Sequence, residues 1–95
     1  MRRAARADAN QAEIVAGLRK AGRTVQPLHT VGRGCPDLLV GVGGTNYLLE
    51  VKDGAKSPSR QRLTPDEAAW HDAWAGMVAT VRSLSEALAA TEKGG

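Results

Sequence analysis

Few aromatic side chains, a single cysteine and no long apolar run distinguish this 95-residue chain. Two Trp, one Tyr and no Phe exclude a nucleic-acid platform built on many stacking rings. The lone Cys35 cannot form a disulfide within the chain, which favours a reducing compartment. No apolar stretch approaches the roughly 20 residues of a membrane-spanning helix, and residues 1–10 lack the apolar segment of a secretion signal. We therefore expect a cytoplasmic protein with no membrane partner.

The charge imbalance is also small, with 13 basic and 10 acidic side chains. A formal charge of +3 permits a nucleic-acid partner without requiring one. Residues 1–95 are short enough to form a single domain, and a domain of this size buries only about 60% of its unfolded surface or slightly more. An apolar contact with a second copy would add burial that one chain cannot supply.

Hydrophobic periodicity and turn residues predict an α/β (α+β) fold in the order α-β-β-β-α-β-α around one small sheet. Asp8 or Asn10 is expected to cap the first helix, and Gly22 to end it. The second helix is expected to start from Thr64, with Glu67 completing a capping box. The helices are predicted over residues 8–22, 63–76 and 83–93, and the strands over 23–31, 36–42, 46–52 and 77–82.

Two of these strands flank the sequence GGTN at residues 43–46, a strong hairpin signal. A loop centred between Gly44 and Thr45 gives one wholly apolar face, on which the expected pairs are Leu38–Val51, Val40–Leu49 and Val42–Tyr47. On the other face Asp37 is expected opposite Lys52 and diagonal to Glu50. A shift of one residue would turn Asp37 into the apolar face, so the same register gives a core and a charged cluster.

The charged cluster has two interpretations. The simpler one is an exposed ion pair between Asp37 and Lys52 with a solvated Glu50, because such pairs are common and weak. Against it, Glu50 lies inside an apolar strand, where a carboxylate must be compensated. Pro36 also restricts the backbone before Asp37, which suits a positioned side chain. We therefore expect a functional site.

Such a cluster suits metal-assisted hydrolysis of a phosphodiester. Two carboxylates and a backbone carbonyl form a hard oxygen site for Mg²⁺, which takes its other ligands from water and substrate phosphate. The ion would polarise the phosphate and lower the pKa of a bound water. Lys52 follows Glu50 by two residues, roughly 7 Å along the same strand face, so it can stabilise developing negative charge.

The motifs GCPDLLVG and LLEVKDG resemble the PD-(D/E)XK nuclease superfamily, and with AEIVAGLRKAG and LTPDEAAWHDAW the chain is similar over nearly its full length to stand-alone phage-type VRR-NUC domains. The resemblance implies a restriction-endonuclease-like αβββαβ core. It also implies an endonuclease dependent on Mg²⁺ or Mn²⁺, acting on branched DNA such as four-way junctions or flaps, often as a homodimer. Carried over, Asp37, Glu50 and the carbonyl of Val51 would bind the metal, and Lys52 would be the catalytic lysine.

Three further polar residues are weighed for this site. The family usually has a glutamate on its first helix that orients a water, a role that fits Glu13, with Gln11 as the alternative. Glu67 stands where the family usually has glutamine, so the resemblance also makes it a candidate catalytic residue, where an extra carboxylate could bind a second metal or repel phosphate. Its capping box with Thr64 is a sufficient structural reason for it as well. The Trp side chains flanking His71 favour packing over catalysis for that residue.

Basic side chains in the polar loop 53–62 are the candidates for DNA binding: Lys56, Arg60 and Arg62, with Arg2, Arg3 and Arg6 as further ones. A solvated loop is the alternative, but this loop directly follows the predicted catalytic strand and can position phosphate there. A module that binds DNA with weak or no activity is the rival function, disfavoured because Asp37, Glu50 and Lys52 are all present. A base-reading restriction enzyme is disfavoured by the small size.

Overall fold

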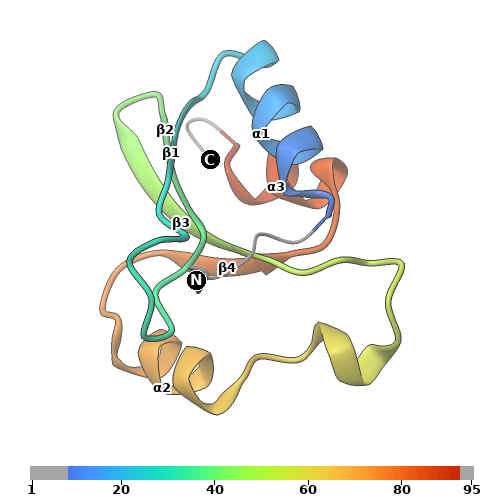
Figure 1. Ribbon diagram of the computed structural model, residues 1–95. Coiled ribbons are helices and arrows are strands. Elements are labelled where there is room, and N and C mark those ends of the chain that lie inside the picture. Colours follow the sequence, from blue (N-terminus) through green and yellow to red (C-terminus); the bar gives the residue numbers. More distant parts are fainter. Residues whose placement is uncertain (1–8, 93–95) are drawn as a thin grey trace.

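The computed structural model describes residues 9–92, which form the predicted α+β fold of three α-helices and a four-stranded mixed sheet (Figure 1). Its elements are α1 (Gln11–Lys20), β1 (Thr24–Pro27), β2 (Leu38–Val42), β3 (Thr45–Val51), the 3₁₀ helix η1 (Pro58–Gln61), α2 (Pro65–Ala73), β4 (Val78–Val81) and α3 (Leu84–Ala90). No helix in residues 9–92 is long and apolar enough to cross a membrane.

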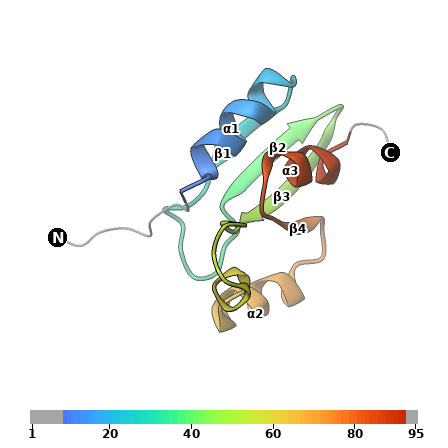
Figure 2. The same ribbon diagram turned by 90° about the vertical axis from the view of Figure 1, so that its right-hand side faces the viewer.

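The strands lie side by side in chain order, β1-β2-β3-β4. The first three are antiparallel, and β4 runs parallel to β3 after a connection that contains η1 and α2. Helices α1 and α3 pack beside each other on one side of the sheet, whereas α2 lies on the other side (Figures 1 and 2). One face of β3 is therefore turned to the main core and the other to α2.

The main core lies between the sheet and the pair α1 and α3. Ile14 and Leu18, one turn apart on α1, are fully buried there. The helices approach closely because Gly17 has no side chain, and a Cβ at that position would collide with Leu84 of α3. The strands contribute Leu38, Val40, Leu49, Val51 and Val81. The predicted apolar face of the hairpin is thus the core face, although its pairing is different.

The predicted hairpin register was wrong by two residues. The turn consists of Gly43 and Gly44 alone, with φ angles of +59° and +82°. Two residues with positive φ close a tight two-residue turn whose twist matches the strands, so Thr45 pairs with Val42 instead of belonging to the loop. The observed core-face pairs are Leu38–Leu49 and Val40–Tyr47. A shift of two preserves which side chains share a face.

The predicted side-chain cap is observed for α2 but not for α1. The capping box of α2 is confirmed, since the Thr64 hydroxyl accepts from the Glu67 N–H at 3.2 Å and the Glu67 carboxylate accepts from the Thr64 N–H at 2.9 Å. Asn10 precedes α1, but its side chain does not cap the helix. Instead its amide donates to the carbonyls of Lys52 and Arg82. Asn10 therefore ties together the ends of β3 and β4. Asp8, the other expected cap, lies outside the described residues.

Candidate active site

Asp37 and Glu50 meet where β2 begins and β3 ends. The Asp37 N–H donates to the Leu49 carbonyl at 3.0 Å, and its own carbonyl accepts from the Leu28 N–H at 2.6 Å. The Asp37 carboxylate accepts from the Val51 N–H at 2.7 Å. The strand ladder stops at the Leu38–Leu49 pair, so Asp37 does not pair regularly with β3 and instead turns its side chain towards it. The predicted register, with Asp37 opposite Lys52, is therefore wrong, and the Asp37 carboxylate contacts the β3 backbone at Val51.

The Glu50 carboxylate is buried without full compensation. Its residue is only 3% exposed, and the oxygen Oε1 has no hydrogen-bond partner among the described residues. Burial, followed by the negative charge of Asp37, raises the pKa of Glu50 to about 9. Lys52 acts in the opposite direction but lies 3.8 Å from the other oxygen, Oε2. A carboxylate in this position becomes a stable anion only if more positive charge arrives.

Lys52 is also nearly buried, and its ammonium group contacts two carboxylates. Its Nζ donates to Glu67 Oε1 at 2.8 Å, which is much closer than its contact with Glu50. The lysine therefore reaches from β3 to the first turn of α2. Sequence spacing predicted the position of Lys52 beside Glu50, but it did not predict that Glu67 would be its nearest partner.

Glu67 belongs to the site as well as to the cap of α2. Although burial opposes its ionisation, the hydrogen bond from Lys52 and then the backbone N–H of Thr64 hold the pKa of Glu67 below its ordinary range. The same oxygen, Oε1, accepts both of these bonds. The structural and functional interpretations of Glu67 are thus compatible, because one carboxylate takes part in both contacts.

A cavity of about 200 Å³ opens beside these groups. It is lined by Asp37, Glu50, Lys52 and Glu67, and by His29 and Cys35 from the segment that leads into β2. Burial, followed by the charges of Glu50 and Asp37, raises the pKa of the Cys35 thiol. Cys35 is therefore a poor nucleophile at neutral pH, and its side chain is half-buried.

The segment between β1 and β2 is shaped to meet α2. Gly32, Arg33 and Gly34 all have positive φ, and Arg33 is the only non-glycine residue of the described chain in that region. A Cβ at Gly34 would collide with the Asp66 carbonyl in the first turn of α2. This close approach brings the segment against the helix that carries Glu67 and closes one side of the cavity.

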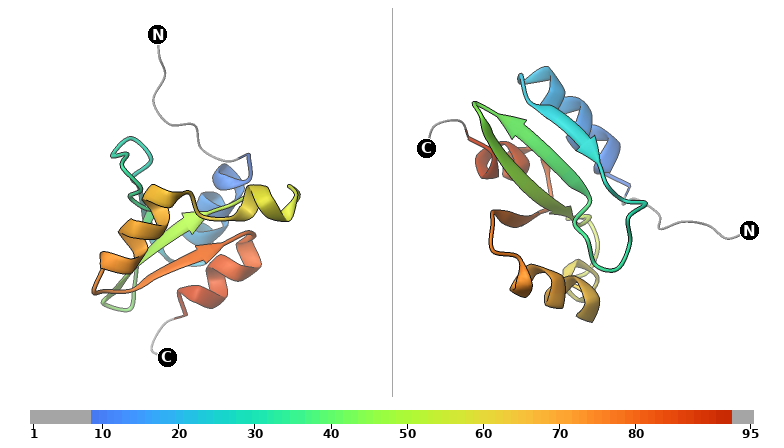
Figure 3. Two further views of the ribbon diagram at one scale, coloured as in Figure 1. Left: turned by 90° about the horizontal axis from the view of Figure 1, so that it is seen from below. Right: turned by 90° about the vertical axis from the view of Figure 1, so that its left-hand side faces the viewer.

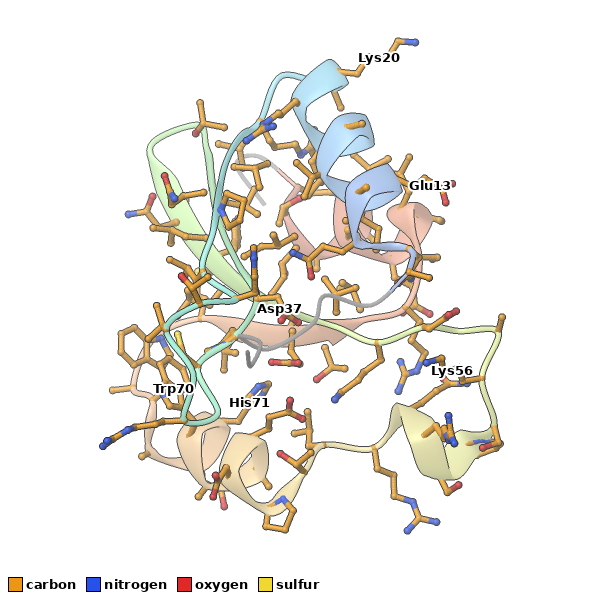
Figure 4. The ribbon with its side chains drawn as sticks, in the orientation of Figure 1. Glu13, Lys20, Asp37, Lys56, Trp70 and His71 are labelled. Carbon is orange, nitrogen blue, oxygen red and sulfur yellow. The ribbon has the colours of Figure 1, made fainter. Side chains whose placement is uncertain are left out.

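The structure does not bring Glu13 into the site. Glu13 is exposed on α1, and Figure 4 shows it far from Asp37 and turned outwards. Gln11, the alternative, is 5% exposed, and its Oε1 is buried without a hydrogen-bond partner among the described residues. The stripe of apolar residues on α1 suggested that Glu13 borders the sheet, but the neighbouring face that holds Gln11 is the one turned inwards.

His71 follows Glu67 by one helical turn and lies on the same side of α2. Its ring packs edge-on against Trp70, at a centroid distance of 6.4 Å, and Trp70 in turn stacks on Trp74 at 4.8 Å. These ring contacts agree with the expected packing role. The nitrogen Nε2 is nevertheless buried without a partner in the described chain, and the ring points from α2 towards the sheet (Figure 4).

The predicted DNA-binding side chains Lys56, Arg60 and Arg62 are all exposed. They belong to the loop that includes η1, and seen from below (Figure 3, left) this loop continues from the end of β3 and leads into α2. Gln61 fastens this loop, since its amide donates to the carbonyls of Gly54 and Lys56. Arg2, Arg3 and Arg6 lie outside the described residues.

Among the described residues, the expected donor set for a metal includes two carboxylate side chains, Asp37 and Glu50, which line the same cavity. No group of three or more His, Cys, Asp or Glu residues within 9–92 is arranged to hold a metal ion. The expected set has its third protein ligand in the Val51 carbonyl, so it does not require a third side chain. No family model, curated protein or solved structure matches this chain.

Proposed function

We propose that this chain is a metal-dependent DNA endonuclease of the PD-(D/E)XK type that hydrolyses phosphodiester bonds. The observation that carries the proposal is the buried Glu50 carboxylate, which lies beside Asp37 with one oxygen unpartnered in the described chain. Two adjacent carboxylates with so little compensation favour the binding of a cation. Strongly perturbed acids in a cavity are also typical of catalytic sites.

The residues fit Mg²⁺, or Mn²⁺ in its place. Glu50 Oε1 is available, and Asp37 is fixed by its hydrogen bond to the Val51 N–H. Hard oxygen donors of this kind suit small divalent cations, which keep several waters. Asp37, Glu50 and the Val51 carbonyl would hold the ion. When bound, it would polarise the phosphate and lower the pKa of the attacking water.

Lys52 is the positively charged side chain that the protein itself would contribute to the site, in addition to the metal ion. Its ammonium group lies between Glu50 and Glu67, at the edge of the cavity where a phosphate would meet the carboxylates. There it can donate to a phosphate oxygen as negative charge develops in the transition state. Glu67 holds the lysine in place by a hydrogen bond from the first turn of α2. Lys52 thus acts in charge stabilisation, with Glu67 as its positioning residue.

The substrate proposed for this site is branched DNA, such as a four-way junction or a flap. The exposed basic loop that carries Lys56, Arg60 and Arg62 follows β3 directly, so it can hold a DNA backbone next to Glu50. The described chain offers no long helix that would read a major groove. We therefore propose that the protein recognises the shape of the DNA. We also propose that it acts as a homodimer that supplies two sites for cleavage.

One observation favours a second candidate, a DNA-binding module without activity. The close ion pair between Lys52 and Glu67 occupies the lysine that the chemistry needs. Cleavage of labelled junction, flap, nicked and linear duplex DNA in Mg²⁺ or Mn²⁺ separates the two candidates. The nuclease is expected to cut the branched molecules preferentially. Binding to all of them without cleavage in either metal would establish the inactive module instead.

A further inference from the structure

A second polar groove lies one strand away from the candidate site. Thr80 of β4 is the parallel neighbour of Glu50, so the two side chains share a face of the sheet. Arg82 follows Thr80 by two residues and lies just beyond the end of β4, beside Lys52, whose N–H donates to the Val81 carbonyl at 2.9 Å. Neighbouring strands are about 4.8 Å apart. The groove is therefore continuous with the surface on which Glu50 and Lys52 lie.

The groove has a volume of about 320 Å³ and lies between β4 and the basic loop. Its walls are formed by Pro58, Gln61, Arg62, Leu63, Thr80 and Arg82. Arg62, Thr80 and Arg82 thus line it together, and their side chains carry hydrogen-bond donors. The sequence identified Arg62 as a DNA-binding candidate but gave no reason to group it with Arg82, which lies 20 positions later on another element.

Arg82 is held in a defined orientation. Its Nε donates to Gln61 Oε1 at 2.8 Å, and its Nη1 lies 3.6 Å from Glu86 Oε1. Glu86 reduces the local positive charge, but it is about half exposed, and the same oxygen accepts from the Arg82 N–H at 2.8 Å. A guanidinium has five N–H donors, so donors beyond these two contacts remain for an anion. A preoriented arginine loses less side-chain entropy when it binds.

Gln61 links both walls of the groove. Its carbonyl oxygen accepts from Arg82, while its amide nitrogen donates to Lys56 O at 2.6 Å and Gly54 O at 3.3 Å. Gly54 also lies close to the Arg82 backbone, since a Cβ added at Gly54 would be 3.3 Å from the Arg82 carbonyl oxygen. These contacts therefore hold the loop against the end of β4, and they place Arg62, the residue after Gln61, at the same groove as Arg82.

We propose that this groove is a second phosphate-binding site, in which Arg62, Arg82 and Thr80 bind a backbone phosphate of the DNA strand that enters the candidate active site. Arginine suits this ligand because its planar donors match two phosphate oxygens. The proposal rests on the proposed function for the identity of the ligand as DNA. It adds Arg82 as a determinant of where the strand lies relative to Glu50.

The test measures DNA binding without cleavage, in metal-free buffer and in a Glu50→Gln background, so it does not depend on nuclease activity. Arg82→Gln and Arg62→Gln are each expected to reduce the slope of log Kd against log salt by roughly one contact. Lys20→Gln is the matched control, because Lys20 is exposed on α1 far from the site (Figure 4) and should leave the slope unchanged. An Arg82→Gln slope equal to that of the parent overturns the proposal.

Two further arms identify the ligand and exclude misfolding. In a series of DNA molecules, one backbone phosphate at a time is replaced by a neutral methylphosphonate. One of these replacements is expected to weaken binding of the parent but not of Arg82→Gln. Arg82→Lys should retain the salt slope with lower affinity, because it keeps the charge and loses the planar donors. Equal sensitivity of the parent and Arg82→Gln at every position overturns the proposal. Inhibition of DNA binding by millimolar inorganic phosphate with no position-specific effect assigns the groove to free phosphate and also overturns it.

Discussion

Lys52 donates a hydrogen bond of 2.8 Å to Glu67 Oε1, the oxygen that also accepts the Thr64 N–H at the start of α2. One carboxylate oxygen thus connects Lys52, which follows β3, with the N-terminal cap of α2, the helix on the side of the sheet opposite α1 and α3. Both partners are mostly buried, with side-chain exposures of 11% and 18%. The position of α2 and the position of the proposed catalytic lysine are therefore interdependent.

Replacement of Glu67 should affect stability through two separable contacts. Thr64→Ala removes part of the cap and should cost about 1 kcal/mol of unfolding free energy. Glu67→Ala removes the cap and also leaves Lys52 without its nearest carboxylate, so we expect a loss of about 2–3 kcal/mol. Glu67→Gln keeps an acceptor oxygen for Thr64 and should fall between the parent and Glu67→Ala. Urea unfolding at pH 7 measures all three, and equal losses for Thr64→Ala and Glu67→Ala would contradict the role of the Lys52 contact.

Glu50 should make the metal-free protein less stable as pH rises. The unfolded chain ionises Glu50 near its ordinary value of 4.5, whereas the folded chain keeps it protonated until about pH 9. Between these values the folded state holds one more proton than the unfolded state, so its stability falls with pH by at most about 1.4 kcal/mol per unit from this group. Glu50→Gln, which cannot ionise, should lack this decline.

The measurement is urea unfolding of both proteins in EDTA between pH 5 and pH 8.5. The stability of Glu50→Gln relative to the parent is expected to increase steadily with pH. Glu13→Gln serves as the control because Glu13 is exposed on α1, and it should follow the parent. A difference between Glu50→Gln and the parent that does not change with pH would show that Glu50 ionises normally, and the buried-acid interpretation would be wrong.

The sequence predicted the order of elements, the core face and the charged cluster because these depend on side-chain alternation. Alternation in a strand has a period of two, so the two-residue error in the hairpin register left every side chain on its predicted face. The error itself came from the Gly43-Gly44 turn. The letters GGTN permit a turn of either length, and only the positive φ of both glycines selects the shorter one.

Contacts between distant segments were not predictable in the same way. Glu67 was identified as a cap from its spacing to Thr64, but its bond to Lys52 depends on how closely α2 approaches β3. Likewise, the parallel pairing of β4 with β3 places Arg82 beside Lys52, and no local pattern reveals this pairing. Glu13 was misplaced because the inward face of α1 includes Gln11, a polar residue that an apolar stripe does not predict.

The basic loop should dominate the salt dependence of DNA binding. Lys56, Arg60 and Arg62 are exposed, and each is expected to make about one phosphate contact. A triple substitution of these residues to Gln should reduce the slope of log Kd against log salt by roughly three. Fluorescence anisotropy with a labelled junction between 50 and 300 mM salt measures the slope. An unchanged slope would remove this loop from the interface.

A homodimer is expected, with the end of α2 in its interface. Trp74 and Met77 are 45% and 53% exposed, which is unusual for large apolar side chains. Sedimentation at micromolar concentration should show a dimer, and Trp74→Glu should convert it to a monomer, whereas Val31→Glu, at another exposed apolar residue, should not. A dimer that survives Trp74→Glu would place the interface elsewhere, for example at the edge strand β1. A monomeric parent would contradict the proposal of a homodimer that supplies two sites.

Metal-dependent cleavage by the site variants tests the central claim most directly. Protein stripped with EDTA and dialysed free of chelator is mixed with a labelled four-way junction, and Mg²⁺ or Mn²⁺ is then added. Addition of metal should start cleavage by the parent and by Glu13→Gln, whereas Asp37→Ala and Glu50→Ala should bind the junction but not cut it. Lys52→Ala should cut more slowly by orders of magnitude, as expected for loss of an electrostatic group in the transition state. Cleavage by Glu50→Ala at the rate of the parent would contradict the account.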